Sequence, residues 1–240
     1  MNSAVKLQRE AEVWTLSLAR PEKRNALSAQ LVEELIDIVE RAPGDGAKVL
    51  VFRGEGKNFS GGFDLADADQ QSEGDLLLRF VRVEMLLQAI AASPCLTVAL
   101  AHGRTFGAGV DIVASCRERY ATPDSSFRMP GLKFGLVLGT RRFGEIVGPE
   151  AARDLQEVAA TFDAARAKEL GFLHGVTEQS DWQGIVDKAR TRAAALPEWS
   201  RKALYEVLSS RESDTDLAWL VRSAARPGLK QRIADYMRAA

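Results

Sequence analysis

The residues from 96 to 113 have the sequence Leu-Thr-Val-Ala-Leu-Ala-His-Gly-Arg-Thr-Phe-Gly-Ala-Gly-Val-Asp-Ile-Val. The apolar and β-branched beginning of this stretch predicts a buried strand over 96–101. The glycine cluster from Gly103 to Gly109 predicts a turn, and the apolar residues through Val113 predict a helix that starts directly after it. A strand that passes through a glycine-rich turn into a helix is typical of α/β proteins.

A second unit of the same kind precedes this one. Residues 48–52 are expected to form a buried strand, and the stretch from Gly54 to Gly62 is again rich in glycine. Apolar positions then recur at helical spacing over 75–92. Two strand–loop–helix units in succession indicate crossover connections, and therefore an α/β core.

The rest of the chain frames this core. Residues 13–18 alternate between apolar and polar types, which predicts a half-buried strand, and Ser28 is expected to cap the helix that follows. Strands become scarce after about residue 145, where Pro149, Asp163 and Gly171 give helix start and stop signals. We therefore expect an α/β core that holds the site over residues 1–180 and a helical region over 181–240.

Composition excludes several classes of protein. The chain has 240 residues, of which 46% are hydrophobic, and its formal net charge is −1. Nucleic-acid-binding proteins usually have a basic excess, so no nucleic-acid partner is expected. Cys95 and Cys116 lack the spacing of a zinc site, and no apolar stretch approaches the roughly 20 residues of a membrane helix. Because the first residues also lack the apolar core of a signal peptide, we expect a cytoplasmic protein with reduced thiols and no membrane partner.

Neither glycine cluster matches a common phosphate-binding motif. A P-loop needs glycine where Val51 stands and serine or threonine where Asn58 stands. A dinucleotide fingerprint beginning at Gly107 would need glycine in place of Ile112. The Gly-x-Ser-x-Gly elbow of serine hydrolases is absent from the sequence. The clusters are therefore either tight loops or a ligand site of another kind.

An oxyanion hole is the ligand site that suits these clusters. Turns at 60–62 and 107–109 would bring peptide N–H groups close to a ligand, because glycine has no side chain to interfere. The second turn opens a helix, whose positive dipole end favours a developing negative charge. One N–H group from each turn would then hold a single oxygen atom.

Four segments in register resemble the enoyl-CoA hydratase/isomerase (crotonase) superfamily. They are Arg20-Pro-Glu-Lys-Arg-Asn-Ala-Leu27, Phe59-Ser-Gly-Gly-Phe-Asp-Leu65, His102-Gly-Arg-Thr-Phe-Gly-Ala-Gly-Val-Asp111 and Asp163-Ala-Ala-Arg-Ala-Lys-Glu-Leu-Gly-Phe-Leu173. The resemblance implies a crotonase-like (ClpP/crotonase) spiral of ββα units followed by a helical region. It also implies an acyl-CoA thioester as substrate, no separate cofactor because CoA is part of the substrate, no metal, and a homotrimer or dimer of trimers.

The resemblance also implies candidate site residues. It places the oxyanion amides at Gly61 and Ala108 and an acid/base at Asp111. The substrate-binding candidates are Lys23, Arg24, Ala26, Gly62, Asp64, Gly107 and Gly131. Lys23 and Arg24 would either meet the phosphates of CoA as cations or lie in solvent as ordinary surface charges.

The sequence departs from the family pattern at one position. Hydratases of this family use two glutamates, and Asp111 and Gly131 occupy those two places. Asp111 keeps a carboxylate, whereas Gly131 has no proton to give or take. Because a positioned acid or base contributes about 10²–10⁴-fold, we expect isomerase or lyase chemistry with one carboxylate rather than efficient hydration. The alternatives are a replacement acid among Glu145, Asp64 and His102, or a non-catalytic acyl-CoA-binding or assembly protein.

Two further hypotheses concern charged and nucleophilic side chains. The adjacent Arg141 and Arg142 either bind a carboxylate on the acyl group or lie on the surface. A serine peptidase on a related fold would need its nucleophile at Ser60 or Ser115, the serines near the glycine clusters. Neither serine lies in a recognisable motif, which disfavours this third class.

Overall fold

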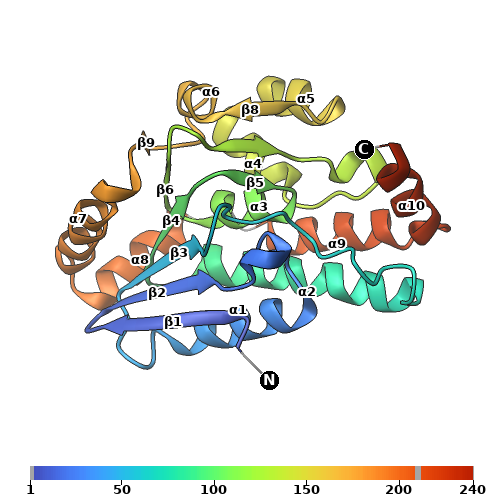
Figure 1. Cartoon of the computed structure of the whole chain (residues 1–240). Helices are drawn as coiled ribbons and strands as arrows, with labels where there is room; N and C mark the ends of the chain where they lie inside the picture. Colours follow the sequence, from blue (N-terminus) through green and yellow to red (C-terminus); the bar gives the residue numbers. More distant parts are fainter. Residues whose placement is uncertain (1–2, 209–211, 240) are drawn as a thin grey trace.

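The computed structural model describes residues 3–208 and 212–239, and its centre is a sheet of six strands (Figure 1). In spatial order the strands are β1 (Val5–Glu10), β2 (Val13–Leu18), β3 (Val49–Gly54), β4 (Leu96–Ala101), β6 (Glu118–Ala121) and β9 (Gly175–Val176). β1 pairs with β2 antiparallel, and the later neighbours are parallel. The strands that precede the two glycine clusters, β3 and β4, are therefore neighbours, and both clusters leave the same edge of the sheet.

A second sheet of three short strands lies next to this edge. β5 (Arg104–Phe106) pairs parallel with β7 (Ser126–Arg128), which pairs antiparallel with β8 (Thr161–Asp163). Ser60 forms an isolated bridge with Thr105 of β5. This bridge joins the first glycine cluster to a short strand within the second, where the sequence predicted only a turn.

The helix ends follow the local signals of the sequence. Ser28 accepts a hydrogen bond from Leu31 N–H and caps α1 (Ala29–Arg41), and Asp163 caps α6 (Ala164–Glu169) in the same way. Pro149 begins α5 (Pro149–Glu157), as predicted. The other helices of the described residues are α2 (Glu73–Ala92), α3 (Ala108–Ser115), α4 (Thr140–Val147), α7 (Trp182–Ala194), α8 (Glu198–Leu208), α9 (Ser213–Ala224) and α10 (Leu229–Ala239), with 3-10 turns η1 (Pro21–Lys23), η2 (Gly131–Phe134) and η3 (Gln179–Asp181).

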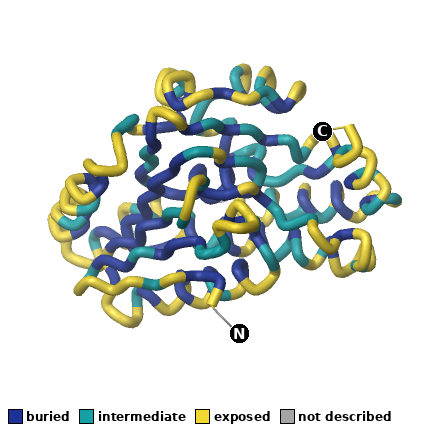
Figure 2. Tube along the Cα trace, in the orientation of Figure 1, coloured by how far each residue is buried: buried dark blue, intermediate teal, exposed yellow. Residues whose placement is uncertain are grey.

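The strand β2 is buried on both faces, so the prediction of a half-buried strand was wrong (Figure 2). One face belongs to the main core, and Val13 on the other face belongs to a second buried cluster with Trp182 of α7. Ser17 is also buried, and its hydroxyl accepts a hydrogen bond from Arg53 Nε at 2.9 Å. The alternation misled because a helix from the end of the chain covers the face expected to meet solvent.

The C-terminal helices pack on the α/β core. α7 contacts β3 and β4, α9 contacts α2, and α10 contacts η2. Figure 1 shows α10 (red) and α7 (orange) at opposite ends of the molecule. The expected boundary at residue 180 lies just before α7, and the division into two domains stays a prediction. Among the described residues, no helix is both long and apolar enough to cross a lipid bilayer.

Candidate active site

The two glycine clusters meet beside β5. Phe106 N–H donates to the Ser60 carbonyl at 2.9 Å, and Ser60 N–H donates to the Arg104 carbonyl at 3.3 Å. Gly62 has a φ of +88°, and a Cβ on it would lie 2.7 Å from the Phe106 carbonyl oxygen. Only glycine fits there, because any side chain would strain the backbone and push the two clusters apart.

The peptide N–H groups at this junction differ in whether they are already bonded. Ala108 is the first residue of α3, and its N–H donates to no acceptor among the described residues, as is usual in the first turn of a helix. Phe63 N–H also lacks an acceptor in the described part of the chain. Gly61 N–H, however, donates to the Arg24 carbonyl at 2.7 Å. This bond corrects the expected donor role of Gly61, whereas the N–H groups of Phe63 and Ala108 are free within the described residues.

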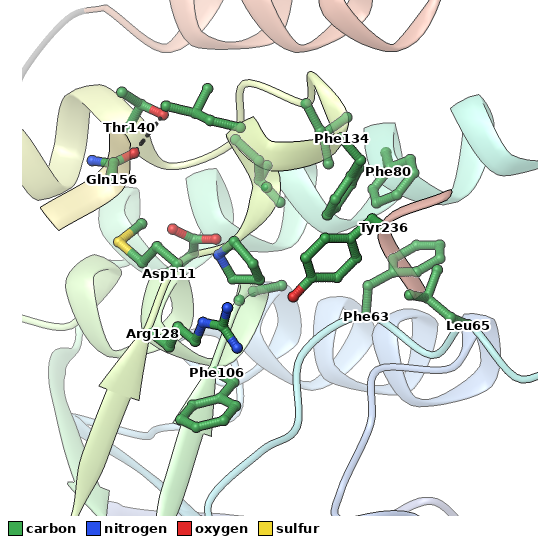
Figure 3. A pocket seen from close by; sticks show the side chains of 18 of the residues that line it. Phe63, Leu65, Phe80, Phe106, Asp111, Arg128, Phe134, Thr140, Gln156 and Tyr236 are labelled. Carbon is green, nitrogen blue, oxygen red and sulfur yellow. Dashed lines mark hydrogen bonds between the residues drawn. The ribbon is translucent and has the colours of Figure 1, made fainter. Parts of the chain in front are cut away.

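A cavity of about 160 Å³ opens beside these two amides (Figure 3). Its wall is mostly apolar and combines both glycine clusters with η2 and α10. A space of this size suits a small organic group, since an engineered cavity of about 150 Å³ in another protein binds benzene. Of the residues expected at the site, the wall includes Gly61, Gly107, Ala108, Asp111 and Gly131.

The carboxylate of this cavity belongs to Asp111. The residue lies one turn after Ala108 in α3 and is only 3% exposed. Its Oδ1 atom has no hydrogen-bond partner among the described residues. Burial raises the pKa of Asp111 well above the ordinary value, while the positive charge of Arg142 opposes this shift and the negative charge of Glu84 adds to it. A carboxyl group with a raised pKa binds a proton more firmly, which suits a group that takes a proton from a substrate.

Two carboxylates share a buried guanidinium near Asp111. Arg142 of α4 forms a two-point ion pair with Glu84 of α2, and Asp216 of α9 lies 3.4 Å from the same guanidinium. Arg141 binds Asp216 through hydrogen bonds of 2.8 and 2.6 Å. Both arginines are therefore held by protein carboxylates, which corrects the hypothesis that one of them binds a carboxylate on the acyl group.

Two of the residues considered as replacement acids lie away from the cavity. His102 is buried, its Nε2 atom lies 2.9 Å from the Gly56 carbonyl oxygen, and burial lowers its pKa. Glu145 forms an ion pair with Arg141, and about half of its side chain is exposed. Neither residue is part of the cavity wall. Gly131 is part of it, so the second acid of the family pattern is missing from the cavity itself.

Asp64 also fails as a replacement acid, because it is bonded elsewhere. Arg20 Nη1 donates to Asp64 Oδ2 at 2.7 Å and to the Ala26 carbonyl at 2.6 Å. Burial would raise the pKa of Asp64, but its hydrogen bonds from Arg20 and from Ala66 N–H outweigh burial and lower the pKa overall. Asp64 therefore holds a turn, and with it the segment of Ala26, rather than capping a helix or facing the cavity.

Asn25 fixes the loop on which the expected phosphate-binding cations lie. Its side chain is fully buried and donates to the carbonyls of Glu55 and Asn58 at 2.9 and 2.8 Å. Lys23 and Arg24, on the same loop, are exposed, and neither forms an ion pair within the described residues. The loop thus presents two uncommitted cations, one of them bonded through its carbonyl to the cavity wall at Gly61.

Several polar side chains of the cavity wall escaped the sequence analysis. Arg128 of β7 donates through Nε to the Ala159 carbonyl at 2.9 Å, and the Thr140 hydroxyl donates to Gln156 Oε1 at 3.1 Å. Tyr236 of α10 directs its hydroxyl among the lining side chains (Figure 3). Arg128 stands close to Gly131 in the sequence, so the motif there gave a signal for it. Tyr236 had no such signal, because only the docking of α10 brings it to the cavity.

The arrangement also bears on nucleophiles and metals. The Ser60 hydroxyl donates to the Asn25 carbonyl at 2.9 Å, and the Ser115 hydroxyl donates to the Asp111 carbonyl at 2.9 Å. Neither serine is part of the cavity wall, so a serine nucleophile finds no support here. Within the described residues, no group of three or more His, Cys, Asp or Glu side chains is placed to hold a metal ion.

Comparison with known sequences identifies the family. Residues 8–229 match the family model for enoyl-CoA hydratase/isomerase. A probable enoyl-CoA hydratase of Mycobacterium bovis is 33% identical over 217 residues, which cover 86% of this chain and 87% of that protein. The chain therefore belongs to the enoyl-CoA hydratase/isomerase family.

Solved structures agree with this membership. A crystal structure from Bordetella parapertussis, assigned to the enoyl-CoA hydratases/isomerases, has 54% identity and a TM-score of 0.97 over 98% of this chain and 99% of that one. A Thermobifida fusca protein assigned as an enoyl-CoA hydratase, in complex with acetoacetyl-CoA, has 25% identity and a TM-score of 0.78 over 99% and 95% of the two chains. The predicted crotonase-like α/β fold is confirmed.

Proposed function

We propose that the protein turns over a short acyl-CoA thioester through an enolate, with Asp111 as the single carboxylate acid/base. The observation that carries the proposal is the Asp111 carboxylate in the wall of a small apolar cavity that is also lined by Phe63 and Ala108, whose N–H groups are free within the described residues. The two amides hold the thioester oxygen, and Asp111 takes a proton from the adjacent carbon. One such donor was worth about 2.7–4 kcal/mol in another enzyme.

The reaction proposed is a double-bond shift or the loss of a group from the enolate, rather than hydration. Addition of water to a conjugated double bond benefits from two positioned acid/base groups. Among the described residues the cavity wall has one carboxyl group, because Gly131 has no side chain. An isomerase or lyase can move the same proton with one carboxylate. The expected absence of a metal and of a separate cofactor follows from this chemistry.

The CoA part of the substrate is proposed to lie against the loop of Lys23, Arg24 and Ala26. Both cations are exposed, and Arg24 is anchored to Gly61 at the cavity wall. If the CoA part extends from the cavity along this loop, its phosphates lie near two positive charges. The acetoacetyl-CoA complex of the Thermobifida fusca protein supports a CoA thioester as the ligand.

We also propose that copies of the chain assemble through the helical region into a homotrimer or a dimer of trimers. Large apolar side chains on α8 and α9 are exposed in the single chain: Trp199 at 79%, Val207 at 75%, Leu208 at 76% and Trp219 at 52%. Large exposed apolar side chains concentrated on two successive helices support an interface in this region, since extensive exposed apolar surface usually marks one. Light scattering after size exclusion tests the assembly, and a monomer at micromolar concentration contradicts it. The cytoplasmic location stays a prediction.

The activity is tested with a panel of short acyl-CoAs whose products are followed by mass. We expect turnover of at least one enoyl-CoA, and a loss of about 10²–10⁴-fold in the Asp111→Asn variant. The rise in melting temperature on addition of CoA, measured for the wild type and for Asp111→Asn, reports binding separately from turnover. Binding without turnover of any substrate would instead favour the second candidate, a non-catalytic acyl-CoA-binding protein.

A further inference from the structure

The cavity wall contains few groups that can exchange a proton with a substrate. Among its described residues, the side chains with a titratable or hydroxyl group are Asp111, Arg128, Thr140 and Tyr236. A guanidinium stays protonated in proteins. The Thr140 hydroxyl donates its proton to Gln156 Oε1. Apart from Asp111, the Tyr236 phenol is therefore the one group in the described part of this wall that is free to donate a proton.

Packing of its ring holds Tyr236 in the wall of the cavity. The ring is half-buried and packs against Phe134, with 5.3 Å between the ring centroids. Its hydroxyl forms no hydrogen bond with any described residue, and Figure 3 shows it pointing among the lining side chains, on the side of Arg128 and Asp111. The apolar contacts thus fix the ring and leave the O–H group to a ligand.

The helix α10, which carries Tyr236, is hydrogen-bonded to the segment of Gly131, where the family pattern has its second acid. Arg232, one turn before Tyr236, donates to the carbonyls of Phe134 and Gly135 at 3.0 and 3.3 Å. Its other terminal nitrogen donates to the Arg226 carbonyl at 3.0 Å. The guanidinium therefore joins α10 to η2, whose first residue is Gly131. The empty side-chain position and the phenol face the same cavity from adjoining segments.

We infer that Tyr236 is a catalytic proton donor that takes the part of the acid missing at Gly131. The inference rests on the proposed function and adds to it the second group of the reaction. In a double-bond shift, Asp111 accepts the proton from the carbon next to the thioester carbonyl, and the electron pair of that bond passes into a conjugated dienolate. The pair at the far carbon then forms a bond to the Tyr236 proton. The proton on Asp111 returns to the phenolate through water, which restores both groups.

The experiment separates the two proton transfers. Exchange of butyryl-CoA with deuterated water needs the oxyanion amides and Asp111, since only the carbon next to the carbonyl is involved. Conversion of vinylacetyl-CoA to crotonyl-CoA needs the second proton transfer as well. Both rates are measured for the wild type, Tyr236→Phe and Asp111→Asn. The Phe variant keeps the ring and its packing on Phe134, so the shape of the wall is preserved.

We expect Tyr236→Phe to lower the ratio of conversion to exchange by about 30-fold or more, and Asp111→Asn to abolish both reactions. Conversion within about threefold of the wild type in Tyr236→Phe overturns the inference, as does an equal loss of both rates, which means a packing role. A wild-type protein that catalyses neither reaction, although CoA stabilises it, overturns the proposed function and the inference together. If Tyr236→Phe keeps the exchange rate of the wild type and lowers the ratio of conversion to exchange, the proposed function and the inference are both supported.

Discussion

The Asp111 carboxylate packs directly on the Cα atom of Gly139, so that a Cβ at position 139 would lie 1.8 Å from Asp111 Oδ1. Gly139 has a φ of +65° and precedes the first residue of α4. The absence of a side chain at this point is therefore what allows the carboxylate to occupy the cavity wall. The position of the active-site acid therefore depends on a glycine that lies outside both glycine clusters in the sequence.

Gly139→Ala is expected to damage both stability and activity. The new methyl group must displace the carboxylate, and alanine at positive φ adds strain, so the free energy of unfolding should fall by about 2–4 kcal/mol. Displacement of Asp111 should lower kcat at least about tenfold. Denaturant unfolding and turnover of the best acyl-CoA provide the measurements.

Gly46→Ala is the matched control. Gly46 has a φ of +90°, and no atom lies within 4 Å of the place that a Cβ would take. Backbone strain alone should lower the free energy of unfolding of this variant, by about 1–2 kcal/mol, and its activity should be unchanged. An active Gly139→Ala protein no less stable than Gly46→Ala would contradict the contact with Asp111.

Local signals in the sequence were enough for much of the fold and part of the site. Ser28 and Asp163 cap helices because capping depends on a few neighbouring residues. The strand–turn–helix unit before Asp111 is equally local, and it carries the acid to the cavity at the first turn of α3. The family resemblance rests on such segments, and the family model confirms it.

The features that the sequence did not predict depend on contacts between distant segments. Which amide of the first glycine cluster is free is decided by the carbonyl of Arg24, which bonds Gly61. The role of Arg142 depends on Glu84, and the burial of both faces of β2 depends on α7. Tyr236 reaches the cavity only because α10 docks on η2. No spacing rule relates these pairs along the chain.

Asp111→Asn is expected to stabilise the protein at neutral pH while it removes activity. Burial raises the pKa of Asp111 in the folded state above its ordinary value of 3.8. Ionisation therefore weakens the folded state as the pH rises above that value, until the folded pKa is passed. Asparagine cannot ionise. The gain in melting temperature over the wild type should grow as the pH rises above about 4 and should level off once the folded pKa is passed. If the difference in melting temperature stays constant or shrinks as the pH rises above about 4, the pKa of Asp111 is not raised in the folded state.

Glu84→Gln is expected to lower the pKa of Asp111. The change removes a negative charge that favours the protonated form of Asp111, so the positive charge of Arg142 is less neutralised and favours the Asp111 carboxylate more strongly. The acidic limb of the pH–rate profile should move to lower pH. Loss of the charged hydrogen bonds should destabilise the protein by about 2 kcal/mol.

Glu145→Gln provides the comparison for this change. Glu145 pairs with Arg141 from a half-exposed position outside the cavity wall. Its loss should leave the profile in place and change stability by less than about 1 kcal/mol. Equal profiles for Glu84→Gln and Glu145→Gln would show that the buried ion pair does not act on Asp111.

Arg232→Met is expected to loosen α10, although Arg232 itself is not part of the cavity wall. The guanidinium of Arg232 donates to backbone carbonyls of η2 and of the turn before α10, so its removal should destabilise the protein by about 2 kcal/mol. Conversion of vinylacetyl-CoA should fall more than exchange of butyryl-CoA, because Tyr236 is no longer held in place. Arg238→Met serves as the control, since Arg238 is exposed and pairs only with Asp235 on its own helix in the described structure. A loss of both rates to the same extent in Arg232→Met would argue against a positioning role.

Gly131→Glu is expected to give the cavity a second carboxyl group and to increase hydration. A Cβ at position 131 would lie 3.1 Å from the Leu136 carbonyl oxygen, so the loop must shift slightly, and a cost of about 1–2 kcal/mol in stability is expected. Because positioned acid/base groups act on the addition of water, hydration of crotonyl-CoA should rise at least about tenfold. Gly131→Gln has the same size but carries no proton-exchanging group, and it should show the cost in stability without the gain. If the two variants hydrate crotonyl-CoA equally, the missing acid at Gly131 is not what limits hydration in this protein.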